Sequence, residues 1–143
     1  SNKLYKNTAK RMIQELELNG YNVTQSTRDI KHFIPKVKRI STKEWLEVFK
    51  RKEVSEDILM TLTITRHIER SPINQSQLGL RINLFEKKDR VVPLAFFNDK
   101  PKGRSWTISP QCHGPCLNAF YAEKVKFPAK ELIGKVITLI KKK

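Results

Sequence analysis

The chain is poor in cysteine, glycine and acidic residues, and it has no long apolar stretch. Two cysteines among 143 residues are too few to staple a small secreted fold, so we expect an intracellular, reducing environment. The longest apolar runs, such as Val91 to Phe97, are far shorter than the ~20 residues that cross a bilayer, and no signal peptide is visible. No glycine-rich phosphate-binding motif is present. We therefore expect no cofactor and no membrane partner.

The shortage of acids leaves a large positive charge. Twenty-nine Lys and Arg oppose fourteen Asp and Glu, which gives a net charge of +15, and the isoelectric point is near 10.0. A folded surface with this excess repels itself, and a polyanionic partner would neutralise it. Nucleic acid, either DNA or RNA, is the commonest such partner. A nuclear or nucleoid location follows from that expectation.

The length suits one domain, and 38% hydrophobic residues suffice for a core. We expect residues 1–143 to form a single α+β domain, with a helical part at 1–54 and a sheet plus C-terminal helix at 55–143. Ser1-Asn2 at one end and a run of lysines at the other indicate a piece excised from a longer protein.

The first third of the chain predicts helices. Leu4, Met12 and Leu16 recur at three- and four-residue spacing and define one face of a first helix, which Gly20 would terminate.

Two more helices are predicted before residue 54. The second would begin at Ser26 or Thr27 and end before Pro35, because the residue before proline disfavours helical geometry. Ser41 to Glu44 form a capping box, which predicts a third helix over 42–52 with a basic C-terminal end.

After Val54 the pattern changes to alternation of apolar and polar residues, which is typical of strands. Five strands are expected, at residues 58–68, 78–84, 90–97, 106–108 and 117–127. Pro128 would open a C-terminal helix whose apolar side covers the sheet. The predicted fold class is thus α+β: N-terminal helices followed by a mainly antiparallel five-strand sheet or partial barrel, closed by a C-terminal amphipathic helix.

Basic residues gather at predicted loops and element ends, where long side chains reach phosphates without disturbing a core. The clusters that we assign to nucleic-acid binding are Lys50, Arg51 and Lys52; Lys87, Lys88 and Arg90; and Lys100, Lys102 and Arg104. A solvated surface explains any one cluster equally well. Several uncompensated clusters together favour a polyanionic partner.

The loop that leads into Trp106 combines cations, a glycine and an aromatic residue. Gly103 would let the backbone approach a phosphate, and Trp106 would stack on a base of a single strand. Trp106 fits a core position equally well, because strand side chains alternate between two faces. We expect that replacing Lys100, Lys102 and Arg104 together by alanine weakens binding with little change in melting temperature.

The segment from Cys112 to Cys116, Cys-His-Gly-Pro-Cys, is the one compact set of metal-type ligands. Structural zinc sites usually carry two ligand pairs, and no second pair exists here. We interpret the segment as a turn with two unpaired thiols and assign no metal. A zinc site and a local disulfide are the alternatives.

Two other function classes stay open beside a binding module without catalysis. A protein-interaction domain of a chromatin, replication or RNA-processing assembly would match its charge to an acidic protein segment. A metal-dependent nuclease would need Asp57, Glu69 and Glu86 to converge near a lysine. A winged-helix arrangement, with the helix over 42–52 in a DNA groove, is the runner-up geometry. Because no catalytic signature stands out, we do not expect an enzyme.

Overall fold

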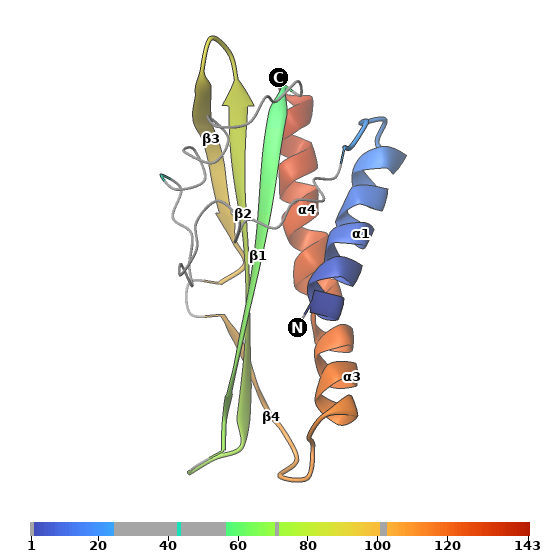
Figure 1. The fold of residues 1–143 in the computed structure, drawn as a ribbon, viewed down its shortest axis with the longest axis vertical. Coiled ribbons are helices and arrows are strands. Elements are labelled where there is room, and N and C mark those ends of the chain that lie inside the picture. The colour runs from blue at the N-terminus through green and yellow to red at the C-terminus, as the bar shows by residue number, and fades with distance from the viewer. Residues whose placement is uncertain (1, 25–42, 44–56, 71, 101–102) are drawn as a thin grey trace. The chain divides into compact units, whose positions relative to one another are not determined.

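The computed structural model describes residues 2–24, 43, 57–70, 72–100 and 103–143. These residues form an α+β fold (Figure 1). Its elements are α1 (Asn2–Leu18), β1 (Ile58–Glu69), β2 (Gln75–Lys87), β3 (Val91–Asn98), β4 (Arg104–Thr107), α3 (Pro115–Lys124) and α4 (Lys126–Lys141). Two predicted helices, the one that begins at Ser26 or Thr27 and ends before Pro35 and the one over 42–52, lie outside the described residues apart from Lys43.

Contacts along the chain divide it into two compact units. The first comprises Ser1–Val23, Leu62–Ile82 and Phe97–Lys143, and the second comprises Thr24–Thr61 and Asn83–Phe96. Each unit draws on segments far apart in the sequence. The first unit holds the three described helices and β4, and the second holds the hairpin that joins β2 to β3.

Helix α1 ends as its sequence predicts. Gly20 has a φ of 88°, which is the left-handed conformation that glycine adopts most readily. The amide of Tyr21 donates to the carbonyl of Leu16 at 3.1 Å, and the amide of Gly20 donates to that of Glu17 at 3.0 Å. This pair of bonds is a Schellman motif, which satisfies carbonyls left unpaired at the helix end.

The described strands form a four-stranded sheet in the order β1-β2-β3, with β4 paired antiparallel to β2. The strands predicted over 58–68, 78–84 and 90–97 are confirmed, and the one near Trp106 is β4. Along β2, Leu78, Leu80 and Ile82 are at most 1% exposed, because every second side chain points to the core. The five-strand count and the closure into a partial barrel are not confirmed.

The strand predicted over 117–127 is wrong, because this segment forms helix α3 and the start of α4. Leu117, Tyr121 and Val125 recur every four residues, and Tyr121 and Val125 are buried. Pro115 occupies the first turn, where its missing amide costs nothing. The aromatic pair Phe120-Tyr121 favoured a strand by propensity, but the four-residue spacing decides the helix.

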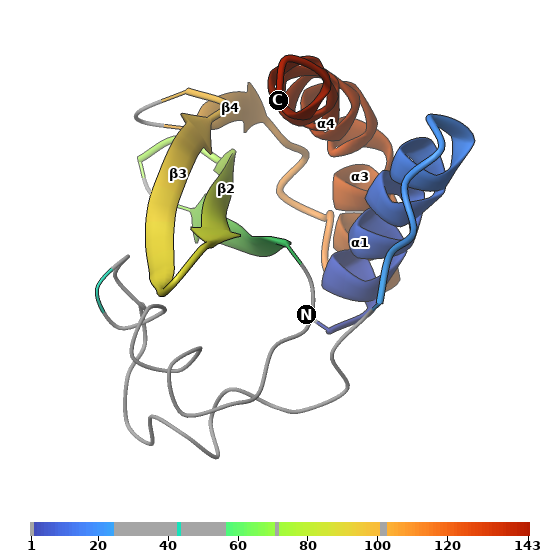
Figure 2. The same cartoon turned by 90° about the horizontal axis from the view of Figure 1, so that it is seen from above.

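Helix α4 begins at Lys126, so Pro128 lies in its first turn and does not open it. Leu132, Ile133 and Val136 are at most 2% exposed, as the apolar stripe predicts. In the first unit α1, α3 and α4 contact one another (Figures 1 and 2). The apolar side of α4 is therefore buried within the protein.

The Tyr121 hydroxyl joins this helical layer to the sheet. It donates toward the carbonyls of His67 at 3.4 Å and Gln77 at 3.5 Å, on β1 and β2 respectively. Within the ranges given above, the structure contains no helix long and apolar enough to span a bilayer.

Candidate nucleic-acid interface

The hairpin cluster lies at the turn between β2 and β3, in the second unit. Lys87, Lys88 and Arg90 are all exposed there, and the amide of Lys88 donates to the carbonyl of Arg90 at 2.9 Å to close the turn. The tip is thus polar and basic, as the sequence predicts. Lys50, Arg51 and Lys52 lie outside the described residues.

The loop cluster is not the row of free cations that the sequence indicates. Lys100 is exposed, whereas Lys102 lies outside the described residues. Arg104 donates to both carboxylate oxygens of Asp99, from Nε at 2.7 Å and from Nη2 at 3.0 Å. The Asp99 side chain is only 3% exposed, so this bidentate pair stabilises a nearly buried carboxylate. The same pairing raises the pKa of Arg104.

Arg104 has two further contacts on α4 that hold its side chain. Its Nη2 lies 3.5 Å from Glu131, and its guanidinium lies 5.2 Å from the ring centre of Phe127, which is 60% exposed. Gly103 has a φ of 75°, and a side chain there would meet the Leu78 carbonyl at 2.9 Å. Gly103 thus serves the approach of two backbone segments within the protein, and its predicted approach to a phosphate stays a prediction.

Trp106 lies on the same side of β4 as Arg104 and is half-buried. Its ring meets Phe120 of α3 edge-on at 5.9 Å, and the Lys124 ammonium lies 5.6 Å from both ring centres. One face of the indole is therefore covered by a cation of its own chain. The base-stacking role of Trp106 stays a prediction.

A second group of cations surrounds a pocket in the first unit, between α1, β1 and α3. Its volume is about 260 Å³. Lys3 and Arg11 reach it from α1 and Arg66 from β1, while Asn118 borders it on α3. No carboxylate is among the residues that line it. We call Lys3, Arg11 and Arg66 the pocket cations.

Arg66 is held in place by an aromatic ring. Its guanidinium carbon lies 5.4 Å from the ring centre of Tyr121, a cation–π contact that arginine forms readily. Tyr121 is fully buried, and this burial raises its pKa. A rigid ring beneath Arg66 reduces the conformational freedom that the guanidinium loses when it binds an anion.

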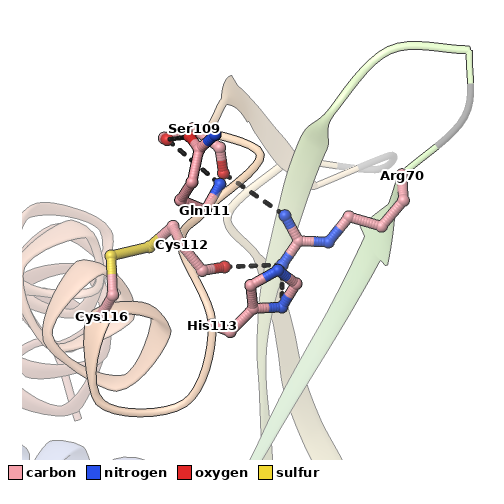
Figure 3. Close-up of a disulfide and its surroundings, with 6 residues drawn as sticks. All are labelled: Arg70, Ser109, Gln111, Cys112, His113 and Cys116. Carbon is pink, nitrogen blue, oxygen red and sulfur yellow. Dashed lines mark hydrogen bonds between the residues drawn. A yellow bond between two sulfur atoms is a disulfide. The ribbon is translucent and has the colours of Figure 1, made fainter.

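The Cys112 to Cys116 turn holds a disulfide with a Cα–Cα distance of 5.2 Å, so the expectation of two unpaired thiols is wrong (Figure 3). Arg70 points at this turn from the end of β1. It donates to the Cys112 carbonyl at 2.6 Å and lies 3.2 Å from Nδ1 of His113. Disulfides persist chiefly in oxidising compartments, so the argument from cysteine for a reducing environment no longer holds.

The nuclease alternative would need carboxylates that converge on a metal ion. Within the described ranges, no three His, Cys, Asp or Glu side chains are close enough to hold a metal ion. Asp57 lies beside the hairpin, where its carbonyl accepts the amide of Lys87 at 2.9 Å.

The pocket cations escaped the sequence analysis, although each leaves a signal. Lys3, Asn7 and Arg11 are four residues apart, so they follow one face of α1. Arg66 interrupts the apolar register of β1, between Ile64 and Ile68. A cation among apolar residues on one face of a strand indicates a position with a functional role. Only the packing of α3 against α1 shows that these residues share a pocket.

The described residues thus define an α+β protein with a cation-lined pocket and a basic hairpin. No family model matches the chain, and neither a curated protein nor a solved structure is similar to it in these comparisons.

Proposed function

We propose that the protein binds nucleic acid through its phosphates and performs no chemistry on it. The observation that carries the proposal is the uncompensated charge of the surface. Lys3, Lys6, Lys10 and Arg11 are all exposed on α1, and none forms an ion pair with a described residue. Exposed cations without ion-pair partners are free to displace counterions from a phosphate backbone.

The net charge of +15 makes phosphate contacts the main source of affinity. Such contacts position a protein on nucleic acid without reading its sequence. A nucleus or nucleoid location would follow from this proposal alone, and the Cys112–Cys116 disulfide argues against it, because disulfides persist chiefly in oxidising compartments. The acidic-partner alternative rests on the same charge, so the experiment must separate the two.

The test is fluorescence anisotropy with labelled single-stranded RNA, single-stranded DNA and duplex DNA, at about 50 and about 200 mM salt. We expect binding that weakens steeply with salt, because each contacted phosphate contributes about −0.9 to the slope of log K against log salt on duplex DNA. The paired change Lys6→Gln and Lys10→Gln should make the slope shallower by about 1 for each phosphate that the variant no longer neutralises.

The result that contradicts the proposal is equally direct. Absence of binding to all three probes at both salt concentrations would overturn it. Competition with a polyglutamate peptide separates the acidic-partner alternative. That alternative is favoured if the peptide displaces the labelled nucleic acid at a lower concentration than unlabelled nucleic acid does.

A further inference from the structure

We propose that the pocket between α1, β1 and α3 holds a phosphate monoester, namely the phosphorylated end of a nucleic-acid strand. The inference rests on the proposed function for the source of the phosphate, and it adds a specific site. Its evidence is the donor set, the space, the charge and the rigidity of one arginine.

The donors that reach the pocket come from three elements. Lys3, Asn7 and Arg11 lie along one face of α1, and Asn118 and Arg66 come from α3 and β1. Lysine and arginine are obligate donors, and the asparagine amides also donate. A group with several acceptor oxygens satisfies all of them at once, and phosphate is such a group.

The space exists because α3 presents small side chains. Ala119 and Ala122 line the pocket one turn apart, and longer side chains at these positions would reach toward α1. A volume of about 260 Å³ is slightly below the ~300–1,000 Å³ typical of drug-sized ligand pockets. It therefore suits a small terminal group and not a continuous strand.

The charge also favours a monoester over a backbone diester. A phosphate monoester carries about −1.5 to −2 at neutral pH, whereas a diester carries a single charge. Three cations and no lining carboxylate make the pocket strongly positive. Glu123 is the acid nearest in sequence to the α3 lining. Its main partner is Lys126 at 2.8 Å, which lowers the pKa of Glu123, and the charge of Arg11 makes a smaller contribution.

Arg66 provides the directional contact. Its guanidinium carbon lies 5.4 Å from the ring centre of Tyr121, and this cation–π contact restrains the side chain before any ligand arrives. An arginine fork binds two phosphate oxygens with parallel hydrogen bonds, which a lysine ammonium does not do.

The first experiment compares oligonucleotides of one sequence with a 5′-phosphate, a 3′-phosphate or hydroxyl ends. We expect one phosphorylated end to bind about tenfold more tightly than the hydroxyl end, because only the phosphorylated end accepts charge-assisted hydrogen bonds from the pocket cations. Lys3→Gln with Arg11→Gln should abolish this preference. Lys6→Gln with Lys10→Gln removes the same charge from the same helix outside the pocket, and should weaken all three oligonucleotides equally.

A second variant fills the pocket without changing its charge. Ala122 is exposed on α3, so Ala122→Leu should leave the fold intact and remove the preference for a phosphorylated end. A thermal unfolding scan of each variant checks that the fold is retained. Inorganic phosphate should compete with the phosphorylated end in the wild type and not in Ala122→Leu.

The failures of the two proposals can be told apart. Salt-sensitive binding without any preference among the three ends would overturn the pocket assignment and leave the proposed function intact. If no oligonucleotide binds, yet inorganic phosphate raises the melting temperature of the wild type and not of Ala122→Leu, the nucleic-acid source is overturned. The pocket assignment would also be overturned if Lys6→Gln with Lys10→Gln lost the preference for a phosphorylated end as fully as Lys3→Gln with Arg11→Gln.

Discussion

Arg104 illustrates how one cation can serve stability when its sequence context indicates binding. The residue stands in a basic loop, yet its fork is occupied by a carboxylate that is 3% exposed. Removing the arginine would leave Asp99 buried and unpaired, which is far more costly than losing a surface charge. The expectation that Arg104 can be replaced with little change in melting temperature conflicts with this geometry.

We predict that Arg104→Ala lowers the free energy of unfolding by about 3 kcal/mol. Lys100→Ala is the matched control in the same loop, and it should stay within about 0.5 kcal/mol because Lys100 is exposed. Chemical denaturation of both variants measures the difference. Equal stability of the two would show that the Asp99 pair contributes little.

Gly134 is a residue whose replacement should help. It is exposed within α4, and a side chain at this position would meet nothing within 4 Å. We predict that Gly134→Ala raises the free energy of unfolding by about 0.5–1 kcal/mol, because glycine has low helix propensity. Thermal and chemical unfolding measure it, and an unchanged or lower stability would contradict the prediction.

Gly103→Ala, in contrast to Gly134→Ala, should lower the free energy of unfolding. The added methyl group would meet the Leu78 carbonyl at 2.9 Å in a left-handed backbone conformation. Its destabilisation would confirm that the position serves backbone packing.

At the scale of elements, the disulfide turn leads directly into α3. Cys112 is 5% exposed and Cys116 is exposed at the start of the helix, so the bond ties the buried end of the turn to the helix. Arg70 holds the same turn from β1. The turn therefore has two independent anchors.

We predict that Cys116→Ser costs about 2 kcal/mol, the loop-closure entropy expected for a bridge across so few residues. The two cysteines are only four positions apart in sequence. Denaturant unfolding with and without dithiothreitol measures the cost, and the reductant should have no effect on the variant. Titration of two free thiols in the untreated wild type would contradict the prediction.

At the scale of the whole molecule, the net charge governs solution behaviour. A charge of +15 on 143 residues generates self-repulsion that salt screens. We predict that the melting temperature rises as sodium chloride increases from about 10 to about 150 mM. The buffer must lack phosphate, so that binding in the pocket does not contribute.

A less charged variant provides the control for this prediction. Lys6→Gln with Lys10→Gln should show a smaller rise, because less repulsion remains to be screened. A fall in melting temperature with salt would show instead that attractive ion pairs dominate.

The helices and strands that local pattern encodes were predictable. The apolar stripe of α1, its end at Gly20 and the alternation along β2 depend on spacing alone, and the structure confirms each of them. Helix α3 was missed although the four-residue spacing of Leu117, Tyr121 and Val125 encodes it locally, because the aromatic residues Phe120 and Tyr121 favour strands by propensity.

By itself, the sequence determined the fold class, the basic hairpin tip and the excess of positive charge, because composition and periodicity act locally. Only the tertiary structure decided which cations are free. Arg104 is paired with Asp99, whereas Lys3, Arg11 and Arg66 meet around a pocket although 55 residues separate Arg66 from Arg11. Whether these three residues lie close together depends on how α1 packs against α3 and β1, and no local pattern encodes that packing.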